Sequence, residues 1–162
     1  MTSQTDPATD KAEQKRQMKS AARLFAVQAL FQMESSGQTV DKVRAEFETH
    51  RFGATIEDDT FSEADPATFR LILEEAVNWQ AKIDQMTDRA LVAKWPIARI
   101  DPVIRALFRA AGAELVGAST PPRVVITEYV DVAHAFFPEG REAKFVNAVL
   151  DHMAREARPE AF

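Results

Sequence analysis

Cysteine is absent from this chain of 162 residues, and its absence removes several classes of function at once. Without a thiol, the chain has no disulfide, no cysteine nucleophile and no thiolate metal ligand, which fits a reducing compartment such as the cytoplasm. No apolar stretch approaches the roughly 20 residues that span a bilayer. The polar N-terminus also lacks the apolar segment of a signal peptide. We therefore expect a soluble cytoplasmic protein without membrane contact.

Side-chain arrangements that support catalysis or metal binding are missing as well. The three histidines are isolated and lack the spacing of a metal-binding motif. Gly112 and Gly117 have the spacing of a phosphate-binding loop, but Ala118 stands where that loop needs its lysine. No motif combines a nucleophile, a base and oxyanion donors. The sequence therefore predicts no enzymatic activity, no cofactor and no metal site.

Glycine is scarce, with five residues, and strand-like alternation is rare, so the sequence favours helices. Asp-Pro and Thr-Pro pairs mark several helix starts, because the first residue can cap a helix and proline suits its first turn. Apolar residues recur at helical spacing, most clearly near the C-terminus. We predict an all-α fold of about seven helices in two small packed bundles. The expected helices span 11–35, 39–50, 66–86, 87–95, 102–117, 121–136 and 141–157.

The same pattern predicts the domain organisation. Residues 1–10 are expected to form a disordered polar tail, and residues 11–158 a single helical domain with sub-bundles of about 11–86 and 87–158. The segment from Phe52 to Ala64 is an acidic connector between helices. We find neither an internal repeat nor a heptad pattern long enough for a coiled coil.

Charge is distributed unevenly along the chain, although the net charge is −5. Lys11, Lys15, Lys19 and Arg23 recur every fourth residue and therefore share one face of the first predicted helix. Such a stripe can neutralise phosphate groups whatever the base sequence, although a run of charges more often forms a merely solvated helix face. Residues 45–75 carry nine acidic groups against two arginines, which suits a basic protein partner.

Three sequence blocks resemble the NusB family of bacterial antitermination factors. They lie at 22–31, at 100–109 with Glu114 and Leu115 after it, and at 144–151, and they keep the family's order and spacing. The resemblance covers about Lys15 to Arg155. It implies a non-catalytic protein that binds the boxA element of ribosomal RNA operon transcripts together with NusE, a small-subunit ribosomal protein. It also implies assembly with the other Nus factors on RNA polymerase.

The resemblance further implies which residues bind RNA. The basic start of the family falls on Lys15, Lys19 and Arg23, whereas Ser20 and Ala21 replace residues that are often arginine. A ring can stack on an unpaired base, although Phe31 and Phe145 also suit a protein core. We expect the basic groups near both ends of the domain to meet on one surface. The remaining candidates are Phe31, Arg109, Arg141, Lys144, Phe145 and Asn147.

For the protein partner, the resemblance indicates the helix that carries Ile104, which replaces a commonly acidic residue of the family. Glu74 and Glu75 are weaker candidates for contact with basic NusE. The sequence leaves open whether the chain is a monomer or a homodimer. Two other functions also remain open: an RNA-docking domain related to ribosomal-RNA cytosine methyltransferases, and a helical protein–protein scaffold that does not bind RNA.

Overall fold

The structure, a computed structural model, describes residues 7–53, 55–56, 59–60, 63–91 and 96–162, and these are mostly helical. Two 3-10 helices, η1 (Ile97–Arg99) and η2 (Pro159–Ala161), are short. The two-residue strands β1 (Thr55–Ile56) and β2 (Asp59–Thr60) pair antiparallel. The all-α prediction of about seven helices is confirmed. The α-helices are α1 (Pro7–Ser36), α2 (Val40–His50), α3 (Pro66–Asn78), α4 (Gln80–Ala90), α5 (Pro102–Gly117), α6 (Pro122–Phe136) and α7 (Arg141–Ala157).

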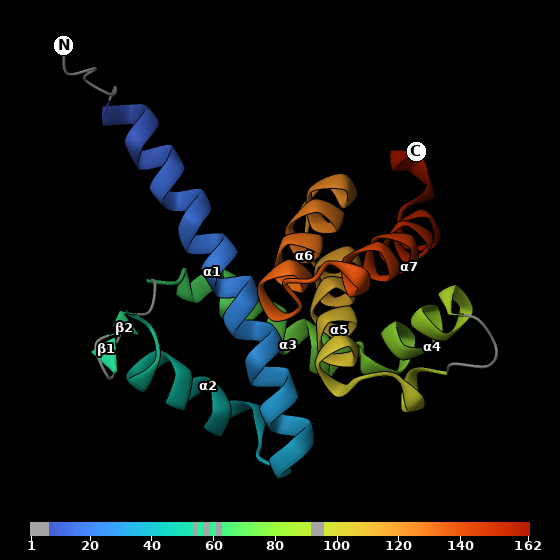
Figure 1. Cartoon of the computed structure of the whole chain (residues 1–162), viewed down its shortest axis with the longest axis horizontal. Coiled ribbons are helices and arrows are strands. Elements are labelled where there is room, and N and C mark those ends of the chain that lie inside the picture. The colour runs from blue at the N-terminus through green and yellow to red at the C-terminus, as the bar shows by residue number, and fades with distance from the viewer. Residues whose placement is uncertain (1–6, 54, 57–58, 61–62, 92–95) are drawn as a thin grey trace.

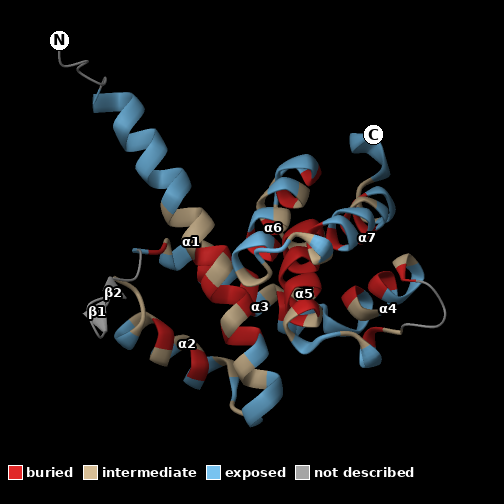
Figure 2. Ribbon diagram, viewed as in Figure 1, coloured by how far each residue is buried: buried red, intermediate tan, exposed pale blue. Residues whose placement is uncertain are grey.

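Helix α5 lies at the centre of the molecule (Figure 1). It packs against α1, α3, α4, α6 and α7. Helix α2 packs on α1 and α3, and α7 packs chiefly on α6, α4 and α5. The buried apolar residues form one continuous cluster to which all seven α-helices contribute. Figure 2 shows this burial concentrated along α5 and the helices beside it.

Both predicted Asp-Pro helix starts have the expected geometry. The side chain of Asp65 accepts a hydrogen bond from the backbone N–H of Thr68 (3.1 Å), and the side chain of Asp101 accepts one from that of Val103 (2.8 Å). These bonds satisfy donors that the first helical turn leaves free. Helix α6 differs, because it begins at Pro122 without a side-chain cap. The hydroxyl of Thr120 instead donates to Glu114 (3.1 Å).

The predicted helix over 66–86 is interrupted at Trp79, whose backbone (φ −113°, ψ 19°) leaves the helical region. Its N–H ends α3 by donating to the carbonyl of Glu75 (3.0 Å), and its carbonyl starts α4 by accepting from Ile83 (2.8 Å). The change of direction lets α4 pack on α7 as well as on α5. No glycine or proline marks this break in the sequence.

Two further helix boundaries differ from the prediction. Helix α1 begins at Pro7, four residues before its expected start, and residues 1–6 lie outside the described residues. The separate helix expected over 87–95 is wrong, because 87–90 belong to α4, which ends at Ala90. Residues 92–95 lie outside the described residues, and Pro96 disfavours helix at the residue before it.

Candidate nucleic-acid interface

The N-terminal half of α1 projects from the body of the molecule as a helical arm (Figures 1 and 2). We define the arm as residues 7–17, all of which are exposed. Lys11 and Lys15 lie on the arm, and Lys19 is half-buried at its base. None of these lysines forms a salt bridge with another described residue. Their charges therefore remain available to a phosphate backbone.

The face of the arm opposite Lys15 borders a groove whose charged side chains are mostly acidic. Glu13 lies about 160° around the helix axis from Lys15. Together with Arg16, it lines a groove of about 850 Å³ against Glu128 and Asp131 of α6. Arg16 already pairs with Glu13 (2.6 Å), so carboxylates outnumber free cations in this groove. A polyanion is therefore favoured on the lysine face and disfavoured in the groove.

Arg23, the last basic residue of the stripe, is inside the protein and is only 5% exposed. Its Nε and Nη2 donate to the two carboxylate oxygens of Glu114 on α5 (2.8 and 3.0 Å), and its Nη1 lies 3.4 Å from Glu128 Oε1. The expectation that Arg23 binds RNA is therefore corrected. Its guanidinium is already engaged by carboxylates of the same chain and faces the core rather than solvent.

Glu114 is the centre of this buried network, at 2% exposure. Besides Arg23, it accepts hydrogen bonds from the hydroxyl groups of Tyr129 (2.6 Å) and Thr120 (3.1 Å). Burial raises the pKa of Tyr129 well above its ordinary value, and the nearby carboxylate of Glu114 raises this pKa further. The phenol therefore stays protonated and acts as a donor. The network joins α1 to α5 and α6.

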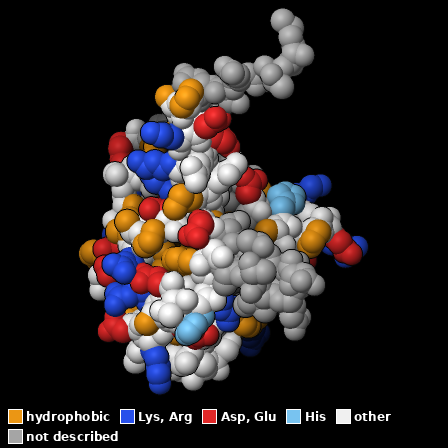
Figure 3. Space-filling view, turned by 90° about the vertical axis from the view of Figure 1, so that its left-hand side faces the viewer, with side chains coloured by type: hydrophobic (Ala, Val, Ile, Leu, Met, Phe, Trp, Pro, Cys, Tyr) orange, Lys and Arg blue, Asp and Glu red, His pale blue; other side chains and the backbone are white. Residues whose placement is uncertain are grey.

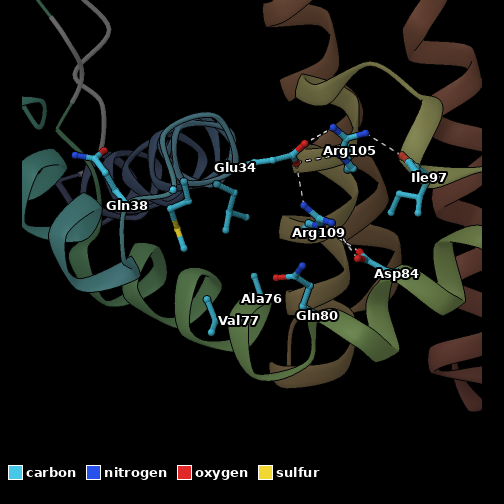
Figure 4. Close-up of a pocket in the computed structure, with 13 residues that line it drawn as sticks. Glu34, Gln38, Ala76, Val77, Gln80, Asp84, Ile97, Arg105 and Arg109 are labelled. Atoms are coloured by element: carbon cyan, nitrogen blue, oxygen red, sulfur yellow. Dashed lines mark hydrogen bonds and ion pairs between the residues drawn. The ribbon is translucent and has the colours of Figure 1, made fainter.

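For Arg109, too, the structure corrects the expectation of RNA binding. Its guanidinium donates to Asp84 on α4 (3.0 and 2.9 Å) and to Glu34 on α1 (3.0 Å), and its side chain is 17% exposed. Glu34 also pairs with Arg105, whose hydrogen bond is the largest cause that lowers the pKa of Glu34. Figure 4 shows this network beside a pocket of about 610 Å³. Because both arginines are neutralised within the chain, Arg109 holds helices together instead of offering a free cation.

The start of α7 presents a second exposed basic group. Arg141, Lys144, Phe145 and Asn147 are all exposed there, whereas Ala143 and its apolar neighbours face the core. The N-terminal end of a helix also carries a partial positive charge, which favours an anion. Four of the predicted RNA-binding residues therefore lie in the first two turns of α7, where Phe145 and Asn147 point about 160° away from each other around the helix axis.

Phe145 borders a largely apolar hollow of about 640 Å³ between α4, the start of α5 and α7. Its ring packs edge-on against Phe108 (centroids 6.0 Å apart, 66° between the ring planes) and stays 37% exposed. Ile104 forms part of the wall and is 7% exposed. Ile104, the candidate for partner binding, is thus nearly buried and contributes only one wall of this hollow. The structure nevertheless brings together one RNA and one protein candidate, Phe145 and Ile104.

Sequence inspection missed several other residues that line the hollow. Their spacing suits core packing equally well, so no local signal separates the hollow from the core. It forms only where the end of α4 and the start of α5 come together beside α7. The additional lining residues are Ala90, Leu91, Arg99, Ile100, Asp101, Ala148, Val149 and His152.

The remaining protein-binding candidates, Glu74 and Glu75, lie on α3. The side chain of Glu74 is 56% exposed and sits 3.7 Å from Arg44. Glu75 accepts a hydrogen bond from the indole N–H of Trp79 (2.7 Å) and covers Gly117 of α5. Glu75 is thus occupied within the chain, and Glu74 is the more available of the two.

Comparisons with known proteins decide the family. The model of the NusB family matches residues 20–155. This chain belongs to the NusB family. The transcription antitermination protein NusB of Agrobacterium fabrum is 47% identical over 142 residues, which cover 87% of this chain and 86% of the relative. The NusB protein of Rhodopseudomonas palustris strain BisB5 is 50% identical over 143 residues, covering 88% and 82%.

Solved NusB structures have the same fold. T. maritima NusB superposes with a TM-score of 0.71 at 28% identity, covering 89% of this chain and 96% of that one. A crystal structure of NusB and NusE in complex with double-stranded RNA gives a TM-score of 0.67 at 22% identity, covering 86% and 98%. At that identity, the second likeness concerns the fold alone.

Within this NusB fold, the cationic candidates occupy two places and not the single surface expected. The arm projects from one side, whereas α7 begins near the centre of the body (Figure 1). In Figure 3, which looks at the molecule from the side of the arm, basic and acidic side chains are interspersed over the visible face. Phe31, 37% exposed, lies 16 residues or about 24 Å along α1 from Lys15 and roughly 160° around the axis. It is therefore not continuous with the lysines.

Two findings complete the description of the NusB-family chain. No helix among the described residues is both long and apolar enough to cross a membrane. Within the same part of the chain, no group of three or more metal-binding side chains is placed to hold an ion.

Proposed function

We propose that this NusB-family protein is a non-catalytic, RNA-binding transcription antitermination factor. In this proposal it binds boxA-type single-stranded RNA together with NusE and joins the other Nus factors on RNA polymerase in the cytoplasm. The names of its relatives, which are transcription antitermination proteins, support this class of function. The structural observation that carries the RNA contact is a projecting helix whose lysines form no salt bridge with any residue that the structure describes.

The arm and the start of α7 would contribute different interactions. Lys15 and Lys19 neutralise phosphates and set the affinity without choosing a sequence. At α7, Lys144 meets a phosphate, Asn147 an unpaired base edge, and the exposed ring of Phe145 a splayed base. Because the two places are separate, the RNA would have to extend from one to the other. This arrangement favours a single strand, whose bases can turn outward individually.

The hollow beside Phe145 is the surface that we assign to NusE. Its wall is mostly apolar and includes Ile104, so it would accept an apolar side chain of the partner. A complex described as NusB with NusE and RNA, formed by a protein of the same fold, supports joint binding. A partner beside Phe145 would contact the same RNA, and two linked contacts reinforce each other. Glu74 offers a separate carboxylate for a basic partner.

We also infer that residues 11–158 act as one domain. Helix α5 packs against helices from both halves of the chain, and the apolar cluster is continuous between them. A break between the halves would expose the apolar faces of α5. RNA binding and partner binding therefore belong to one folded unit.

Fluorescence anisotropy with labelled boxA RNA, with and without NusE, tests the proposal. The affinity is expected to increase when NusE is added and to decrease with salt. A Lys15→Gln, Lys19→Gln variant should reduce the log–log salt slope by about 1.4, because each phosphate contact contributes about 0.7 for single strands. Lys42→Gln changes an exposed lysine on α2 and is the matched control, with no expected change.

The outcomes also separate this proposal from the scaffold alternative. If the chain binds NusE but RNA makes no difference, the scaffold interpretation replaces ours. If a scrambled RNA binds as tightly as boxA in the presence of NusE, the specific recognition of boxA is wrong, although RNA binding itself would remain.

A further inference from the structure

The base of the arm is tied to the body by three different elements. The backbone carbonyl of Met18 accepts a hydrogen bond from the N–H of Asp65, just before α3 (3.0 Å). Ser20 Oγ donates to Glu128 Oε2 on α6 (2.9 Å). Arg23 then makes its two hydrogen bonds to Glu114 on α5. Three residues within a six-residue stretch of α1 are thus held by α5, α6 and the residue that caps α3.

The pair of Arg23 and Glu114 differs from the exposed ion pairs of this protein because both groups are almost fully buried. Burying two charges carries a desolvation cost, and apolar residues of similar volume often stabilise a fold as well or better. A bidentate arginine–carboxylate pair instead fixes the relative orientation of its two partners. Every buried side-chain nitrogen or oxygen among the described residues has a hydrogen-bond partner. The network is therefore complete, and its bidentate geometry favours one orientation of α1 on α5.

Orientation at the base matters because the arm is exposed along its whole length. A helix transmits a change of direction along its axis, and Lys15 lies eight residues, about 12 Å, beyond Arg23. A tilt of about 20° at Arg23 would therefore move Lys15 by about 4 Å. That displacement is enough to break a charge-assisted hydrogen bond to a phosphate.

We propose that Arg23 is a positioning residue, which fixes the direction of the lysine-bearing arm toward RNA through Glu114 and Glu128. This inference rests on the proposed RNA-binding function and deepens it. Arg23 belongs to the basic stripe by its spacing but acts on RNA only through the geometry of the arm. The lysines supply the charge, and the buried network sets where that charge is presented.

The test exploits the absence of cysteine from the chain. Ala12→Cys on the arm and Val124→Cys on α6 provide two exposed sites for spin labels. Electron–electron double resonance then measures the distribution of distances between arm and body in the full chain without RNA. The test variant, Arg23→Gln with Glu114→Gln, replaces the ion pair by two neutral amides and leaves no uncompensated buried charge. Arg70→Gln with Glu48→Gln, an exposed bidentate pair of the same chemistry, is the matched control.

We expect the test variant to broaden the distance distribution and to weaken RNA binding, with an unchanged salt slope. If the arm points productively in about one tenth of the molecules, the apparent affinity falls about tenfold. The control pair should leave both measurements unchanged. If the test variant does not fold, Ser20→Ala with Glu128→Gln removes the half-exposed hydrogen bond at the base of the arm instead. This variant should also broaden the distance distribution and weaken RNA binding, to a smaller extent.

Two results would overturn the inference. An unchanged distance distribution and unchanged RNA affinity would give Arg23 a purely structural role. A salt slope reduced by about 0.7 with an unchanged distribution would mean that Arg23 contacts a phosphate directly. If Lys15→Gln has no effect on RNA binding, the proposed contact between the arm lysines and RNA is wrong. The distance measurement alone then still decides whether Arg23 fixes the direction of the arm.

Discussion

Gly112 on α5 lies directly against Ile83 on α4: a Cβ atom added to Gly112 would stand 2.3 Å from Ile83 Cγ2. Both residues are buried. This close approach brings Asp84, the next residue on α4, within reach of Arg109 on α5 (2.9 Å). A missing side chain at one position thus sets the distance between two helices and allows the ion pair beside it.

Gly112→Ala is therefore expected to destabilise the protein. The added methyl group has to displace the branched side chain of Ile83 in a packed core, which typically costs about 1–3 kcal/mol. Urea denaturation followed by helical circular dichroism measures the free energy of unfolding. Combining Gly112→Ala with Ile83→Ala, which removes the clashing atoms, should cost less than the sum of the two single changes. Additive effects would show that the clash does not occur.

Tyr129 gives a prediction for alkaline pH. Its folded-state pKa is raised by burial and by the carboxylate of Glu114, whereas the pKa in the unfolded chain is about 10. The protonated phenol therefore contributes stability that is complete below about pH 10 and is lost as the pH rises through the folded-state pKa. Because the chain has only one tyrosine, tyrosinate absorbance reports on this residue alone. We expect that signal to appear together with the loss of helical circular dichroism. Ionisation of Tyr129 near pH 10 while the fold is intact would contradict the raised pKa.

Glu34 gives a prediction for acid pH with the opposite sign. The hydrogen bond from Arg105 lowers the folded-state pKa of Glu34, with a further contribution from Arg109. Its contribution to stability is therefore present above the unfolded value of about 4.3 and is lost as the pH falls through the lowered pKa. Glu34→Gln should be less stable than the parent near neutral pH and equally stable at strongly acid pH. Urea denaturation across this range measures the difference.

The control for Glu34 is Glu139→Gln, which neutralises an exposed carboxylate after α6. It should lower the free energy of unfolding much less at neutral pH. A constant difference between Glu34→Gln and the parent at every pH would mean that Glu34 contributes through packing and not through its charge.

Local chemistry explains which parts of the fold the sequence predicts. Asp65 and Asp101 cap helices through bonds to residues two or three positions away, so neighbouring residues are sufficient to find them. The break at Trp79 depends on the packing of α4 against α5 and α7, and no nearby glycine or proline indicates it. The overall helical fold was therefore predictable, whereas the division of α3 from α4 was not.

The same distinction applies to the candidate site. Lys15 is exposed on the projecting arm, and its spacing in the sequence is enough to predict its place. Arg23 has the same spacing, but its partner Glu114 lies 91 residues further along the chain. Arg109 likewise pairs with Glu34, 75 residues away. Whether an arginine is free or neutralised within the chain depends on such distant partners, which periodicity does not reveal.

Phe145 and Phe162 have equal exposed fractions of 37% but different surroundings, and this difference gives a prediction for RNA binding. Phe145 lies among the basic residues at the start of α7, whereas the ring of Phe162, at the C-terminus, is covered by the guanidinium groups of Arg123 and Arg155. Phe145→Ala should weaken binding of boxA RNA by about 1–3 kcal/mol through loss of base stacking. Anisotropy titration in the presence of NusE measures the change.

Phe162→Ala is the matched control, because it removes the same kind of ring at a position after η2, away from the start of α7. We expect this variant to leave RNA affinity unchanged. Phe145→Trp, which keeps an aromatic surface, should retain most of the binding because stacking tolerates different rings. Phe31→Ala tests the other aromatic candidate in the same titration, and a comparable loss is expected if the strand also reaches the end of α1. Equal effects of Phe145→Ala and Phe162→Ala would contradict base stacking at α7. If Phe145→Ala weakens NusE binding without RNA, the ring belongs to the protein contact in the hollow instead.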